Sequence, residues 1–127
     1  MNIEKIRKFT DLAVWQEGHK LVLMIYKITK GFPKEERYGL IDQMRRAAVS
    51  ITSNIAEGFS RKSPRDKYQF YTIAKGSLTE LQNQLLVAKD VGYISEESFN
   101  KIAKQSVIVH KCANGLLKAT RFKKYEN

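Results

Sequence analysis

The segment LIDQMRRAAVSITSNIAEGF, residues 40–59, decides the fold class of this chain. Its apolar residues recur every three or four positions, which is the spacing of an α-helix with one buried face. No alternation typical of a β-strand competes with this spacing. The segment therefore predicts an amphipathic helix with an apolar stripe formed by Leu40, Ile41, Met44, Ala48, Ile51, Ile55 and Phe59.

Breaks on either side of this segment divide the chain into further helices. Gly31-Phe32-Pro33 precedes it and Ser63-Pro64 follows it. Pro64 suits the first position of a helix that Ser63 caps. Gly92 suits a left-handed helix end, and Ser95 suits the cap of the next helix. We therefore expect four helices, at about 11–30, 35–61, 64–91 and 96–123.

Short connections join these helices, so that successive helices must run antiparallel. The expected fold is all-α, an antiparallel up-down-up-down four-helix bundle that forms a single domain over residues 1–127. A chain of this length buries roughly two-thirds of its unfolded surface on folding. Its 43% hydrophobic content is enough to build one core.

The first helix carries more apolar surface than one core face requires. We assign one stripe to the core, and a second stripe lies about 100° round the helix. An apolar face this wide indicates either a wide core or a subunit contact. We favour the subunit contact and expect a homo-oligomer. The core stripe is Leu12, Trp15, His19, Val22 and Tyr26, and the second is Val14, Leu21, Ile25 and Ile28.

The net charge of +10, from 23 basic and 13 acidic residues, favours a negatively charged partner such as nucleic acid, anionic lipid or an acidic protein. Lysines of the first and last helices recur every seven residues, which places each set on one line. Because these helices are neighbours in the expected bundle, we predict one lysine track that contacts phosphates without reading bases. The alternative is a solvated face that only maintains solubility. The candidate nucleic-acid-binding residues are Lys20, Lys27, Lys104, Lys111, Lys118 and Arg121.

The helix at 35–61 also has a polar edge beside its small residues. This edge is either a solvated face or an interface, in which a planar arginine bonds a carboxylate in two places. Glu80 of the next helix is a candidate partner for Arg45 or Arg46. The candidate interface residues are Arg45, Arg46, Ser50, Asn54, Glu57 and Glu80.

The sequence shows no constellation of catalytic residues, so we expect a protein that is not an enzyme and has no metal or cofactor. His19 and His110 are expected on core faces, without carboxylates at chelating spacing. The single cysteine, Cys112, suits a reducing compartment. The charged N-terminus does not resemble a signal peptide, and the apolar run 21–26 is too short to span a bilayer. We therefore expect a cytoplasmic protein.

Several segments resemble the bacterial four helix bundle protein family, whose members are encoded in intervening sequences within large-subunit ribosomal RNA genes. The resemblance runs from about Phe9 to Arg121 and is most specific at Arg45-Arg46-Ala47-Ala48-Val49-Ser50-Ile51 and Asn54-Ile55-Ala56-Glu57-Gly58. It implies a four-helix bundle. It also implies a ring-shaped homopentamer, by similarity to the accessory protein of diversity-generating retroelements, which binds nucleic acid and a reverse transcriptase. The segments that carry it are 11–16, 32–40, 43–51, 53–59 and 74–81.

Two functions follow from these observations. The first is an oligomer that binds nucleic acid, structured RNA in preference to DNA, with little sequence specificity. The alternative is an interaction scaffold that recruits an acidic or nucleic-acid-bound partner such as a reverse transcriptase. No membrane partner is expected.

Overall fold

The computed structural model describes residues 5–126, and side chains as far as Arg121. Helices α1 (Ala13–Thr29) and α2 (Leu40–Ser60) are followed by the longer helices α3 (Pro64–Asp90) and α4 (Glu96–Glu126). Short 3-10 turns precede α1 and α2, namely η1 (Phe9–Asp11) and η2 (Lys34–Glu36). No strand is present in residues 5–126.

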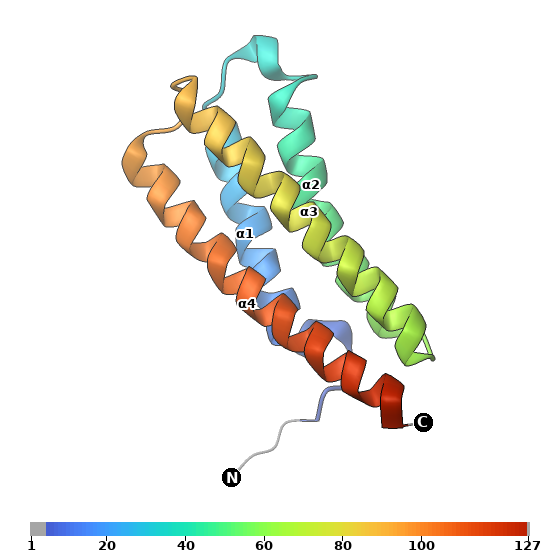
Figure 1. Cartoon of the computed structure of the whole chain (residues 1–127). Coiled ribbons are helices and arrows are strands. Elements are labelled where there is room, and N and C mark those ends of the chain that lie inside the picture. The colour runs from blue at the N-terminus through green and yellow to red at the C-terminus, as the bar shows by residue number, and fades with distance from the viewer. Residues whose placement is uncertain (1–4, 127) are drawn as a thin grey trace.

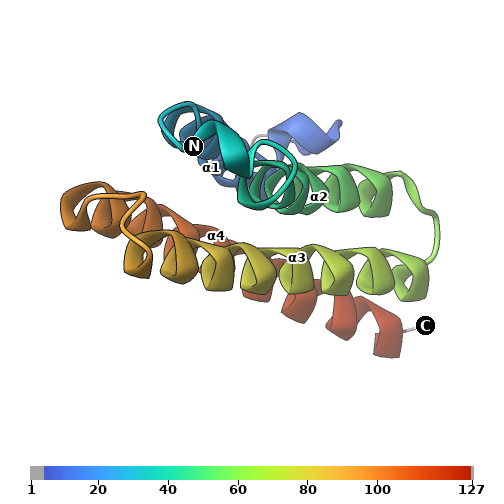
Figure 2. The same ribbon diagram turned by 90° about the horizontal axis from the view of Figure 1, so that it is seen from above.

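The four helices pack into a bundle in which each helix contacts two others (Figure 1). α1 packs against α2 and α4, and α3 packs against the same two helices. Seen from above, α1 and α2 form one layer over α3 and α4 (Figure 2). The expected all-α four-helix fold is confirmed.

Helix α2 begins at Leu40 and not at residue 35, where the sequence pattern placed its start. Residues 34–36 form η2 instead, and the Glu36 carboxylate accepts a hydrogen bond of 3.0 Å from the Leu40 backbone N–H. The other oxygen of Glu36 accepts a 2.8 Å bond from the Tyr93 hydroxyl. These bonds lower the pKa of Glu36, the Leu40 bond most, and the Glu36 carboxylate raises the pKa of Tyr93. One carboxylate thus caps α2 and ties the α1–α2 connection to the α3–α4 connection.

The most extensive contact joins α2 to α3, because small residues let these helices approach closely. A Cβ added to Gly58 of α2 would lie 2.7 Å from Tyr71 Cε1 and 2.9 Å from Phe70 Cβ, both of α3. Halfway along, the hydroxyls of Ser50 and Ser77 lie 2.8 Å apart. The fully buried side chains gather between the helices and include Leu21, Ile25, Met44, Ile51, Ile55, Leu78, Leu81, Leu85 and Val109.

The face that α1 turns to the core is rotated from the one expected, although Val22 of the expected core stripe is buried and Leu12 and Trp15 pack against the core. The stripe assigned to a subunit contact is the core face, since Leu21 and Ile25 are fully buried and Val14 is 3% exposed. The stripe assigned to the core leaves His19 and Tyr26 exposed. Gly18 explains this rotation: α1 approaches α2 on the side of this glycine, where an added Cβ would lie 3.1 Å from Thr52 Cγ2. The wide apolar face of α1 is therefore a wide core and gives no support for a subunit contact.

The Glu36 bonds predict a specific dependence of stability on acid. Because folding lowers the pKa of Glu36, its contribution is complete above the ordinary pKa of about 4.3 and is lost as pH falls through the lower folded value. We expect Glu36→Gln, which keeps an acceptor for the Leu40 N–H, to flatten the acid decline of the free energy of unfolding. Urea unfolding over a pH series measures this, with Glu35→Gln as the exposed control. Parallel declines in parent and Glu36→Gln would contradict it.

Candidate nucleic-acid interface

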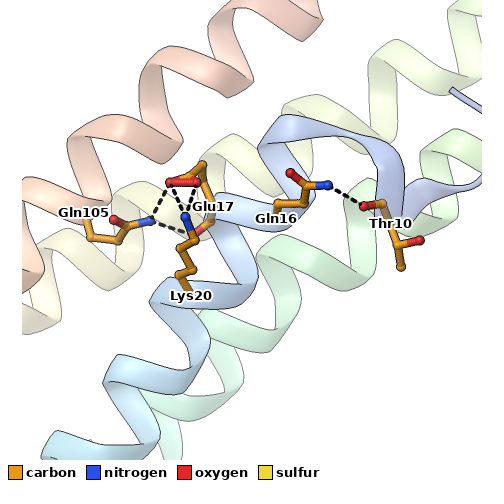
Figure 3. A network of polar contacts seen from close by, with 5 residues as sticks. All are labelled: Thr10, Gln16, Glu17, Lys20 and Gln105. Atoms are coloured by element: carbon orange, nitrogen blue, oxygen red, sulfur yellow. Dashed lines mark hydrogen bonds and ion pairs between the residues drawn. The ribbon is translucent and has the colours of Figure 1, made fainter. Parts of the chain in front are cut away.

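The seam between α1 and α4 brings the first and last helices together, as the lysine track requires. Gln105 of α4 donates its side-chain N–H to the Glu17 backbone carbonyl of α1 at 2.9 Å, across 88 residues of sequence (Figure 3). The Glu17 carboxylate in turn pairs with Lys20 at 2.8 Å. Nearby, Gln16 donates to the Thr10 carbonyl at 3.0 Å and holds η1 against α1 (Figure 3). The seam is thus fixed by polar bonds beside the lysines.

Lys20 differs from the other lysines of the predicted track because it already has a negative partner. The pKa of Glu17 is lowered, first by Lys20 and then by Gln105. The other track residues are exposed. They take part in none of the three ion pairs found among the described side chains. The uncompensated charge of the track therefore lies on Lys27, Lys104, Lys111, Lys118 and Arg121.

The lysines of α4 form a line on the side of the helix away from the core. Lys104, Lys111 and Lys118 are all exposed, while Ile102 and Val109 are buried. Sequence reasoning missed Lys101, three residues before Lys104, which continues the line because residues three apart share a helix face. Lys101 and Lys27 of α1 also line one groove of about 510 Å³. Positive charge from both helices therefore meets at this end of the seam.

The candidate interface residues of α2 and α3 fall into two groups. Arg45 reaches α1, where its Nε donates to Thr29 Oγ1 at 2.9 Å and its guanidinium lies 4.6 Å from the centre of the Tyr26 ring. Ser50 contacts Ser77 of α3, and Asn54 donates to the Ser50 carbonyl at 2.8 Å. Arg45 therefore joins α2 to α1, Ser50 joins α2 to α3, and Asn54 supports Ser50.

The second group is exposed, and its ion pairs and hydrogen bonds join residues only three or four positions apart. Arg46 pairs with Asp42 at 3.0 Å, and Glu57 pairs with Arg61 at 3.2 Å. Glu80 accepts a bond from Gln84 at 3.2 Å, so neither Arg45 nor Arg46 is its partner within the chain. Arg46 and Glu57 therefore make no contact with another helix among the described residues, since both are exposed, and a subunit contact for them stays a prediction.

The two histidines have different surroundings. His19 is exposed and stacks on Trp15 with ring centres 4.7 Å apart, which corrects its expected place in the core. His110 is half-buried, and its Nδ1 has no hydrogen-bond partner among the described residues. Cys112 is a half-buried free thiol. Within the described part of the chain, no three His, Cys, Asp or Glu side chains are placed to hold a metal ion.

These features define a class of protein: a four-helix bundle with a basic flank along α1 and α4. Residues 10–115 match the model of the 23S rRNA-intervening sequence protein family, and the chain belongs to this family.

A solved structure has the same fold. It is that of a protein with unknown function from the S23 ribosomal protein family of Bacteroides thetaiotaomicron. The TM-score is 0.78 and the identity 23%, over 86% of this chain and 98% of that one. No curated protein matches the sequence. Among the described residues, no helix is long and apolar enough to cross a membrane.

The two neighbouring arginines are expected to differ in their effect on stability. Arg45→Ala removes a bond to Thr29 and the contact with the Tyr26 ring, and should lower the free energy of unfolding by about 1–2 kcal/mol. Arg46→Ala removes an exposed ion pair and should change it by less than about 0.5 kcal/mol. Urea unfolding of both variants at low protein concentration measures the difference. Equal losses would show that Arg46 has a further contact.

Proposed function

We propose that this chain is a non-enzymatic nucleic-acid-binding protein that contacts phosphates through the lysines of α4 and the adjoining flank of α1. The observation that supports this most is the line of exposed lysines Lys101, Lys104, Lys111 and Lys118, which form no ion pair among the described side chains. Lys27 adds to this line across the seam, through the groove that it shares with Lys101.

The spacing and type of these residues favour a phosphate backbone. Lysines seven residues apart stand about 10 Å apart along a helix, a distance that about three nucleotides cover at 3.4 Å each. Lysine binds phosphate as a point charge and does not read base edges in the way that arginine does, so the binding has little sequence specificity. Membership of a family named for an intervening sequence of 23S rRNA favours RNA over DNA as the ligand.

Self-association is the second part of the proposal. The apolar stripe of α1 is buried in the core, but other large apolar side chains are exposed to between 37% and 57%. Burying such side chains against further copies removes them from water. A closed ring of five chains, as the family resemblance implies, repeats the lysine line and increases avidity wherever one RNA reaches several copies. The exposed apolar side chains include Leu23, Val49, Ile73, Leu86, Val87, Val91, Val107 and Ile108.

One observation favours an interaction scaffold as the second candidate function. A hollow of about 610 Å³ between α1 and α2 combines Tyr26 and Val49 with the cations Arg45 and Arg46, and Arg46 pairs with Asp42 in the same lining. Aromatic residues and arginines are frequent at protein interfaces. A partner protein with an acidic surface would fit this hollow.

The charge of α4 gives the test of nucleic-acid binding. Each phosphate contact steepens the fall of log affinity with log salt by about 0.7 for a single strand. We expect Lys104→Gln/Lys111→Gln to weaken binding of all RNA sequences alike and to flatten the slope by about one to two contacts. Fluorescence anisotropy over a salt series measures both effects.

A charge-matched control isolates the position of the charge. Lys62→Gln/Arg65→Gln removes two exposed cations at the α2–α3 connection and should change the slope less. If both double variants behave alike, the α4 line is only a solvated face. If the parent binds no RNA at low salt, the scaffold function replaces this one.

The oligomer has its own test. Light scattering of the purified protein at micromolar concentration should give the mass of five chains. Leu86→Glu, which places a charge on an exposed apolar side chain, tests whether that surface is a contact. A monomer mass for the parent would exclude self-association as a source of avidity.

A further inference from the structure

A pocket at the turn from α1 to α2 gathers four cationic side chains that the lysine track does not include. It has a volume of about 410 Å³ and lies between the end of α1, η2 and the first turns of α2. Lys30 comes from the end of α1, Lys34 and Arg37 from the connection, and Arg45 from α2. None of the described residues that line the pocket is acidic.

Two of the nearby acidic groups have partners outside the pocket, and the third, Glu35, is exposed and is not among the lining residues. Glu36 binds the Leu40 N–H and the Tyr93 hydroxyl, and Asp42 pairs with Arg46. Within residues 5–121, neither Lys30, Lys34 nor Arg37 takes part in an ion pair. Like charges held this close repel one another, and an anion in the pocket would relieve that repulsion.

One wall of the pocket is preorganised. The Nε of Arg45 donates to Thr29 Oγ1 at 2.9 Å, and its ring contact with Tyr26 fixes the guanidinium plane. A terminal nitrogen of Arg45 also donates to the Tyr26 carbonyl at 3.4 Å. A guanidinium has five N–H donors in a planar fork, so donors remain for a phosphate after the bonds to Thr29 and Tyr26. Lys30, Lys34 and Arg37 are exposed and can move to meet a ligand.

The pocket also has an apolar part. Phe32 is 6% exposed, Ile41 is half-buried, and both line the same space as the cations. Binding sites for small molecules have volumes of about 300–1,000 Å³ and combine apolar walls with a few placed polar groups. Four cations beside two apolar side chains therefore fit a ligand with one strongly anionic group and one flat apolar group.

We propose that this pocket binds a nucleotide through a phosphate monoester, with the base against Phe32 and Ile41. A monoester carries a charge of about −1.5 to −2 at neutral pH, whereas a backbone diester carries one charge, so four cations favour the monoester. Such a group occurs at the phosphorylated end of a nucleic acid and on a free mononucleotide. For a nucleic-acid end the inference rests on the proposed function, with the lysine line holding the strand and the pocket holding its terminal phosphate.

The test compares one short single-stranded RNA with a 5′-phosphate and with a 5′-hydroxyl. We expect the parent to bind the phosphorylated RNA about tenfold more tightly, because the 5′-phosphate adds at least one charge-assisted hydrogen bond. Lys34→Gln/Arg37→Gln should reduce this ratio to below about twofold. The fold should be unaffected, because these two side chains are exposed and make no hydrogen bond among the described residues. Lys62→Gln/Arg65→Gln, with the same loss of charge, should keep the ratio.

A second measurement distinguishes a free mononucleotide from a nucleic-acid end as the ligand. It also tests the pocket separately from the proposed nucleic-acid-binding function. Adenosine monophosphate should raise the melting temperature of the parent, adenosine should not, and Lys34→Gln/Arg37→Gln should abolish the shift. If RNA fails to bind and this shift is present, the pocket is a mononucleotide site and the proposed function is wrong. If the parent shows no preference for phosphorylated RNA and no shift with adenosine monophosphate, the pocket proposal is overturned, whatever the α4 variants show.

Discussion

The close approach of α2 and α3 is the constraint on which the rest of the bundle depends. At Gly58 the two helix surfaces leave no room for a Cβ beside Tyr71, and the small side chains of Ser50 and Ser77 meet in the middle of the contact. With this pair fixed, α1 packs against α2 and α4 packs against α3. α1 and α4 then meet along the seam that Gln105 and Glu17 bridge. The basic flank of the molecule is thus a consequence of how tightly the opposite pair of helices is packed.

Much of the fold was predictable, because helical periodicity and the residues that start and end helices are local properties of a sequence. Ser63 and Pro64 begin α3, and Gly92, with φ of 89°, follows its end. The rotation of α1 was not predictable in this way, because its two apolar stripes are of similar strength and only the side on which α2 approaches decides between them. The start of α2 is capped by Glu36, and the carboxylate of Glu36 is also bonded by Tyr93, which is 57 residues away. Bonds between residues so far apart leave no periodic signal in the sequence.

The candidate sites were likewise predictable where they depend on one helix, and not predictable where they depend on contacts between several segments. The lysine line on α4 followed from a seven-residue repeat, since charge on one helix needs only the geometry of that helix. The pairing of Lys20 with Glu17 leaves less charge on Lys20 for a phosphate, and the seven-residue repeat of lysines does not specify this pairing. The cationic pocket was not predicted, because its residues come from a helix end, an irregular turn and the next helix. In the sequence they are four basic residues without a common spacing.

The seam between α1 and α4 has a consequence for the order in which the chain gains its structure. The other neighbouring helices are joined by short connections, so their contacts close small loops. The bond between Gln105 and Glu17 closes a loop of 88 residues, and the entropy lost on closure grows with loop length. Contacts of this kind slow folding, and we expect this seam to form after the α2–α3 pair. A chain that has not completed this last step has a charged α4 but lacks the groove shared by Lys27 and Lys101, so the full basic flank marks a completely folded molecule.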